Sequence, residues 1–418
     1  MKKVLFTVAL VFGAMVASAQ VSVVKEAKAK KGNPVEAAKI IEAALTNPET
    51  ANDPETWKLA GDFQKAIYDA ENEKLYLSQV DKSKVADLPK LYNSLLKMFE
   101  YYTKCDEVEQ AGVANGTIKK AKLRKKNAET LLQVRPNLAN GGIEAFNTND
   151  YASAQKFFSL YVDVVENPMF ADKAEALKAD TLNALYANYA TMAAGLRDPK
   201  DVDAVIKYGT IGKEDKNEGW RGLMCMAEVY GNKESGDSIK WLEVVKEGAE
   251  KFPQQDFFVG SIMDYYLQKG LYDEGLTQIE KMLASNEKPF LLYVKGALLY
   301  EKKDYAAAHE AYDKVIAKNE GDTPETSLVA EAYAKKGDCY FFPAQTIVEE
   351  NSTLAIDDPK YATNEAKIKE AYEQAKPFYE KAKELEPDNK NIWCQQLLRI
   401  YWALNKAEYE ALEKEMAY

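Results

Sequence analysis

The chain has 418 residues, and its 55 lysines and arginines against 66 aspartates and glutamates give a net charge of −11. This acidic balance disfavours general nucleic-acid binding. The content of 21 glycines and 14 prolines is low for a soluble protein, which argues against collagen-like, disordered and turn-dense all-β classes. A single histidine leaves few options for catalysis.

The N-terminus has the pattern of a targeting segment. Two lysines precede an apolar run at residues 4–16, and an Ala-Ser-Ala sequence at residues 17–19 fits a small-residue cleavage site. The run is shorter than the ~20 residues that a membrane-spanning helix needs. We therefore expect residues 1–19 to be a cleaved secretory signal and the protein to be periplasmic or secreted, with an uncleaved membrane anchor as the alternative. No cysteine follows the run, so lipoprotein attachment is not supported.

The remaining sequence predicts helices from end to end. Helix-start signals combine a capping side chain with a following proline, as at Asn33-Pro34, Asp53-Pro54 and Asp198-Pro199. Between these signals apolar residues recur at intervals of three and four, and sustained alternation with period two is absent. We expect a long first helix in the N-terminal third, followed by a loop near residues 80–88.

Small and aromatic residues recur at a fixed spacing in three parts of the chain. Two units lie 33 residues apart, and a third lies upstream; their members are Gly296, Tyr305, Ala308 and Tyr312, then Met263, Tyr272, Gly275 and Ile279, and then Gly142, Tyr151, Ala154 and Phe158. A small residue on each of two helices permits their close approach, and a ring fills the space beside that contact. The spacing predicts paired helices that repeat along the chain.

This pattern resembles the tetratricopeptide repeat, a 34-residue helix–turn–helix unit. The resemblance implies an all-α fold, a right-handed superhelical solenoid of stacked antiparallel helix pairs. We expect an N-terminal helical region with an insertion at residues 20–135 and a solenoid at residues 136–418. A further insertion is expected at residues 343–364, and a hinge is placed near residues 133–141.

The sequence contains no catalytic or metal-binding motif. Its four cysteines match no metal or redox spacing, so we interpret them as small buried side chains, with one disulfide as the alternative. His309 lacks any partner at a useful spacing, which indicates a packing or surface role. We expect no enzymatic activity, no cofactor and no metal.

A basic run extends from Lys119 to Lys126. Contact with an anionic partner is one interpretation. The other is a solvated helix face that lies opposite acidic neighbours such as Asp106 and Glu109.

In the tetratricopeptide repeat family the first helix of each pair lines a concave groove. The resemblance places the following aromatic residues in such a groove, with Asp264, Glu301 and Asp338 among them: Tyr293, Tyr300, Phe341, Phe342, Tyr401 and Trp402. The alternative is that several of these rings belong to the core. Together with the targeting segment, this groove predicts an exported, non-enzymatic scaffold that binds a protein segment. A glycan-binding module of the cell envelope is the alternative. The sequence leaves the oligomeric state open.

Overall fold

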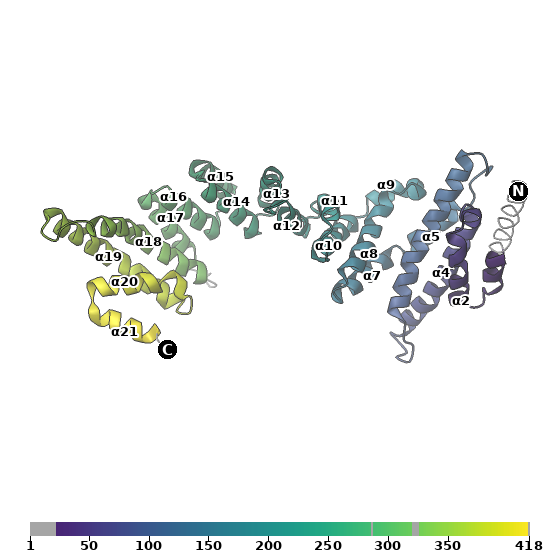
Figure 1. Ribbon diagram of the computed structural model, residues 1–418, viewed down its shortest axis with the longest axis horizontal. Coiled ribbons are helices and arrows are strands. Elements are labelled where there is room, and N and C mark those ends of the chain that lie inside the picture. Colours follow the sequence, from purple (N-terminus) through teal and green to yellow (C-terminus); the bar gives the residue numbers. More distant parts are fainter. Residues whose placement is uncertain (1–21, 286, 320–325, 417–418) are drawn as a thin grey trace, which may run out of the picture. The chain divides into compact units, whose positions relative to one another are not determined.

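The computed structural model describes residues 22–285, 287–319 and 326–416 (Figure 1). The predicted signal at residues 1–19 lies outside these ranges. Every regular element within them is a helix, and none is a strand, so the predicted all-α class of stacked helical pairs is confirmed. No helix in the described ranges is long and apolar enough to cross a membrane.

The structure divides into two compact units, residues 1–241 (unit 1) and residues 242–418 (unit 2). This division differs from the boundary predicted after residue 135. The Arg135 side chain is buried, and it donates hydrogen bonds to the Tyr161 carbonyl and to Asn183 and forms an ion pair with Asp180 at 2.7 Å. These contacts tie the predicted hinge to helices that follow it, so residues 22–241 pack as one body.

Unit 1 begins with helices of unequal length. Its helices are α2 (Pro34–Leu45), α3 (Pro48–Ala51), α4 (Pro54–Leu77), α5 (Leu88–Ala114), α6 (Arg124–Val134), α7 (Pro136–Asn147), α8 (Tyr151–Asp163), α9 (Ala174–Lys178), α10 (Leu182–Leu196), α11 (Val202–Gly212) and α12 (Gly219–Tyr230). The Asn33 and Asp53 side chains cap α2 and α4 as predicted. The third predicted start is displaced, because α11 begins at Val202 with Asp201 as its cap.

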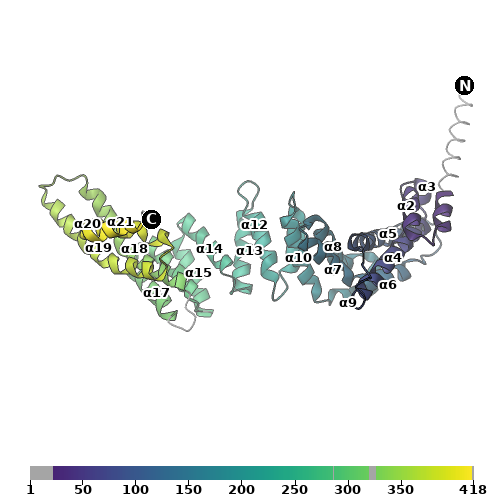
Figure 2. The ribbon, with the colours of Figure 1, turned by 90° about the horizontal axis from the view of Figure 1, so that it is seen from below.

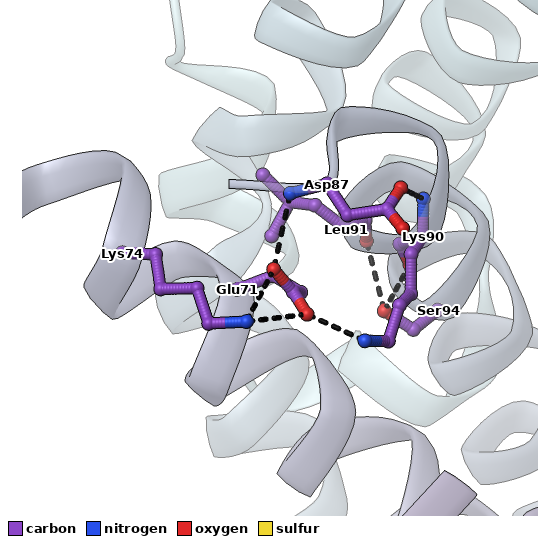
Figure 3. A network of polar contacts seen from close by, with 6 residues as sticks. All are labelled: Glu71, Lys74, Asp87, Lys90, Leu91 and Ser94. Atoms are coloured by element: carbon purple, nitrogen blue, oxygen red, sulfur yellow. Dashed lines mark hydrogen bonds and ion pairs between the residues drawn. The ribbon is translucent and has the colours of Figure 1, made fainter. Parts of the chain in front are cut away.

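A buried carboxylate joins α4 to α5 (Figure 3). Glu71 of α4 is 1% exposed, and its Oε1 lies 2.6 Å from Lys90 Nζ and 3.0 Å from Lys74 Nζ. Its Oε2 accepts a hydrogen bond from the backbone N–H of Asp87, whose own side chain caps α5. Glu71 therefore fixes the end of the loop between Leu77 and Leu88, which lies where the sequence predicted it.

Helix pairs close around a glycine that lies under an aromatic ring. A Cβ atom added at Gly142 of α7 would lie 2.6 Å from the Phe158 ring of α8. In unit 2, a Cβ atom added at Gly296 would lie 2.5 Å from the Tyr312 ring. Real Cβ contacts are never this short, so the close approach requires glycine. The recurring residues of the sequence pattern thus meet as predicted.

Unit 2 consists of helix pairs with short connections, preceded by α13, which crosses the division between the units. Its helices are α13 (Ser238–Lys251), α14 (Asp256–Lys269), α15 (Tyr272–Ser285), α16 (Pro289–Glu301), α17 (Tyr305–Lys318), α18 (Thr326–Asn351), α19 (Pro359–Leu385), α20 (Cys394–Leu404) and α21 (Lys406–Met416). In both views the joined ends of α18 and α19 extend beyond α20 and α21 (Figure 1 and Figure 2).

Residues 343–364 do not form a separate insertion between two helices. They lengthen both helices instead, because α18 continues through Pro343 to Asn351 and α19 starts at Pro359. A proline within a helix removes one backbone hydrogen bond. The extensive packing of α18 against α19 outweighs that loss, so α18 continues past Pro343.

Candidate functional site

The six predicted groove residues lie in different surroundings. The prediction that Phe341 lines a groove is wrong. This side chain is 3% exposed and packs in the core against the rings of Tyr372 and Tyr379. Its neighbour Phe342 is 43% exposed. The two neighbours differ in exposure because consecutive side chains of a helix point about 100° apart, so that Phe341 faces the core and Phe342 faces the solvent.

Tyr401 of α20 is half-buried and fixed by charged side chains of α19. Its hydroxyl donates a hydrogen bond to Glu380 at 2.8 Å, and Lys376 Nζ lies 5.2 Å from the ring centre. Tyr300 packs edge-on against Tyr305, with ring centres 5.4 Å apart. Neither ring presents a free face as large as that of Trp402, which is 73% exposed.

Tyr293 and Asp338, however, do come together. They line a small polar pocket of about 130 Å³, here called the inner pocket. Its walls come from α16, α18, the 3-10 helix η3 (Lys390–Ile392) and the start of α20. The lining residues are Tyr293, Glu331, Ala334, Lys335, Asp338, Asn391, Ile392 and Gln396. The other two predicted acidic residues, Asp264 and Glu301, are exposed and lie outside it.

Asp338 is the best-satisfied charge of the inner pocket. It is 6% exposed, accepts a hydrogen bond from the Tyr379 hydroxyl at 2.6 Å, and pairs with Lys335 at 2.9 Å. Burial and the neighbouring Glu331 carboxylate, to which the Tyr293 hydroxyl donates, raise the pKa of Tyr293 above its usual value. Tyr293 therefore stays protonated at neutral pH and remains a hydrogen-bond donor.

A larger cleft of about 1060 Å³ lies at the far end of α18, here called the outer cleft. It is lined by Gln345, Val348, Asn351, Ser352, Leu354, Ile356, Tyr361, Glu365, Ile368, Lys369, Tyr372, Gln395, Leu398, Arg399, Trp402, Ala403 and Tyr409. Because α18 and α19 are about twice as long as α20 and α21, their joined ends extend beyond these two shorter helices. Trp402 is the one predicted groove residue in this cleft.

The outer cleft combines exposed apolar side chains with an unsatisfied polar atom. Ile356 is 84% exposed and Trp402 is 73% exposed. Asn351 is 6% exposed, and its Oδ1 atom has no hydrogen-bond partner in the part of the chain that the structure describes. Large apolar side chains gathered on a surface usually mark a binding site. Sequence reasoning missed Ile356 and Asn351 because it assigned their segment to an insertion.

The histidine and the cysteines that the sequence analysis considered lie in packed surroundings. His309 packs edge-on against the stacked rings of Tyr340 and Phe378, and burial followed by the nearby Lys336 charge lowers the pKa of its imidazole. All four cysteines are free thiols, and three of them are buried. No group of three or more His, Cys, Asp or Glu residues in the described ranges could hold a metal ion.

The basic run divides at the start of α6. Arg124 forms a two-pronged contact with the buried Asp106, with an ion-pair distance of 2.7 Å. The Glu109 carboxylate accepts hydrogen bonds from the backbone N–H groups of Lys122 and Leu123, which precede the helix. The predicted acidic neighbours are thus present, but residues 119–123 form a loop and not a helix face.

Substituting two aromatic residues should separate the binding surface from the core. We expect Trp402→Ala to lower the free energy of unfolding by less than about 1 kcal/mol, since an exposed side chain loses little packing. Phe341→Ala should cost about 3 to 5 kcal/mol, because it empties a core position. Denaturant unfolding followed by circular dichroism measures both; equal losses would place Trp402 in the core.

No protein-family model matches the chain, and no curated protein matches it either. The chain resembles solved tetratricopeptide repeat proteins. A TPR repeats protein from Bacteroides fragilis NCTC 9343 is 17% identical, with 65% of this chain and 99% of that chain covered and a TM-score of 0.33. A tetratricopeptide repeat protein from Parabacteroides merdae ATCC 43184 is 18% identical over the same shares, also with a TM-score of 0.33. Yeast Tom70 is 14% identical, with 95% of this chain and 91% of that chain covered and a TM-score of 0.29.

Proposed function

We propose that this protein is an exported, non-enzymatic scaffold that binds a segment of another protein along α18 and α20 of unit 2. The observation that carries the proposal is the outer cleft, in which Trp402 is 73% exposed beside other uncovered apolar side chains. Export rests on the signal pattern of residues 1–19. The absence of a catalytic motif in the sequence supports a binding role.

The inner pocket and the outer cleft share the same two helices. On α18 the lining residues advance from Glu331 and Lys335 in the pocket to Gln345 and Val348 in the cleft. On α20 the two sites meet at neighbouring residues, because Gln396 lines the pocket whereas Gln395 and Trp402 line the cleft. The two helices are the first members of their pairs, which is where the repeat resemblance placed a groove.

The chemistry of the outer cleft favours a protein segment over a glycan. An exposed indole ring suits either ligand. Leu354, Ile356, Ile368 and Leu398 also line the cleft, and aliphatic side chains match the apolar anchors of a peptide better than they match hydroxyl-covered sugars. Rigid helices hold these side chains in place, so binding need not order the surface.

Photo-crosslinking from position 402 tests the proposal. Trp402 is replaced by p-benzoylphenylalanine in the full-length protein, which is expressed in its own cells and irradiated. We expect a covalent adduct of higher mass that contains a second polypeptide. The matched control places the same group at Tyr76 of unit 1, which is 74% exposed, and should give no such adduct.

The outcomes separate the two candidate functions. Adducts that contain sugar but no second polypeptide would favour the glycan-binding alternative. Equal adduct formation from positions 402 and 76 would show that exposure alone accounts for the reaction, and the proposed site would be wrong.

A further inference from the structure

We propose that the inner pocket receives a basic side chain of the bound segment, while an apolar side chain of the same segment occupies the outer cleft. This inference rests on the proposed function and adds the chemistry of the partner. It identifies that partner by two features, a lysine or arginine and an apolar anchor, at a defined separation.

The first argument is the charge of the inner pocket. Its lining carries two carboxylates and one ammonium group. Lys335 pairs with Asp338 at 2.9 Å, so these two charges cancel. Glu331 has no ion-pair partner among the described residues; the neighbouring hydroxyl of Tyr293 donates to it but brings no charge. The pocket therefore keeps one uncompensated negative charge.

The second argument is an unsatisfied acceptor. The Gln396 Oε1 atom is buried and has no hydrogen-bond partner among the described residues. A buried acceptor without a donor costs free energy. Lysine and arginine side chains carry donors and no acceptors, so they can satisfy both Gln396 Oε1 and the Glu331 carboxylate. An acidic or apolar side chain at this place would leave Gln396 Oε1 without a donor and the charge of Glu331 without a counter-charge.

The third argument is size. The pocket measures about 130 Å³. Because a water molecule has a share of about 30 Å³ in the liquid, this space holds only a few waters. An ammonium or guanidinium group fits, whereas a bulky apolar anchor suits the outer cleft of about 1060 Å³.

The two sites lie at a fixed distance along α18. Lys335 lines the inner pocket and Val348 lines the outer cleft, and a helix rises about 1.5 Å per residue, so these two residues lie about 20 Å apart along the axis of α18. At about 3.3 Å per residue, an extended segment would bridge them with about six residues. A helical segment would need about thirteen.

Selection from a random peptide library displayed on phage tests this inference with a defined probe. Peptides about twelve residues long are sufficient to reach both sites when extended. We expect peptides selected on the purified mature protein to carry a lysine or arginine about six residues from an aromatic or aliphatic residue. A synthetic peptide of that sequence then serves for affinity measurements by fluorescence anisotropy.

Two substitutions in the pocket should weaken the peptide without harming the fold. Glu331→Gln keeps the size and the hydrogen bond from Tyr293, and it should weaken binding about tenfold or more. Replacing the basic residue of the peptide with glutamine should cause a similar loss, and combining both changes should add little further. Gln396→Leu should also weaken binding, yet it should raise the melting temperature because it removes an unsatisfied buried group.

Glu349→Gln is the matched control. This residue is exposed on α18 and lines neither site, so the same change of charge should alter affinity less than twofold. The inference is wrong if the selected peptides lack basic residues, or if Glu331→Gln and Glu349→Gln have equal effects. In either case polypeptide adducts from position 402 would leave the proposed function standing. Failure to select any peptide, together with a lack of such adducts, would overturn both.

Discussion

Ala308→Arg should lower the free energy of unfolding of unit 2 by about 3 kcal/mol or more, a loss comparable to that expected for Phe341→Ala. Ala308 is fully buried in a cluster that includes Leu299, Tyr312 and Val315. An arginine there must either displace these close-packed side chains or bury its charge without a partner. Urea unfolding of the full chain, followed by circular dichroism, measures the loss.

Glu310→Arg on the same helix is the matched control for that prediction. Glu310 is exposed and forms none of the contacts of the Ala308 cluster, so the change should stay within about 0.5 kcal/mol. Equal unfolding midpoints for the two arginine variants would contradict the register of α17.

Glu71→Ala should have the largest effect in unit 1. The variant leaves Lys74, Lys90 and the backbone N–H of Asp87 without their shared acceptor. Burial acts to raise the pKa of Glu71, but the hydrogen bonds from Lys90, Asp87 and Lys74 outweigh it and lower that pKa from 4.5 to about 2. A difference of this size corresponds to about 3 kcal/mol of stability at neutral pH.

The contribution of Glu71 should depend on pH in a defined direction. Because its pKa is lower in the folded state, its stabilisation is fully present above pH 4.5 and is lost as the pH falls toward about 2. Unfolding free energies of the native protein and of Glu71→Gln should therefore converge over this window. Asp69→Ala, which removes an exposed ion pair with Lys65 on the same helix, should cost less than about 1 kcal/mol at neutral pH. A loss from Glu71→Ala no larger than that from Asp69→Ala would contradict the structural role of Glu71.

The sequence predicted those features of the fold that depend on local spacing. The spacing of the residues around Gly142 and Gly296 predicted the helix pairs, because only glycine lets an aromatic ring of the second helix lie so close to the first helix. Asn33 and Asp53 marked helix starts, because each side chain caps a backbone N–H two or three residues away. Such signals act within a few turns of chain, so one sequence suffices to recognise them.

Helix ends and side-chain directions within helices were harder to predict. Residues 343–364 were predicted to form an insertion, but α18 continues to Asn351 and α19 starts at Pro359. Phe341 and Phe342 are consecutive residues of the same type, and only their packing shows which of the two rings is buried. Both outcomes depend on neighbours that lie elsewhere in the sequence.

By itself, the sequence determined that this protein is helical, that its helices pair around small residues, and that it carries no recognised catalytic motif. The tertiary structure alone decided where a ligand could bind. The outer cleft exists because two long helices pack beside two short ones, and the inner pocket exists because three helices bring Tyr293, Glu331 and Gln396 together. Lengths and distances of this kind arise from packing between distant segments, and no local pattern records them.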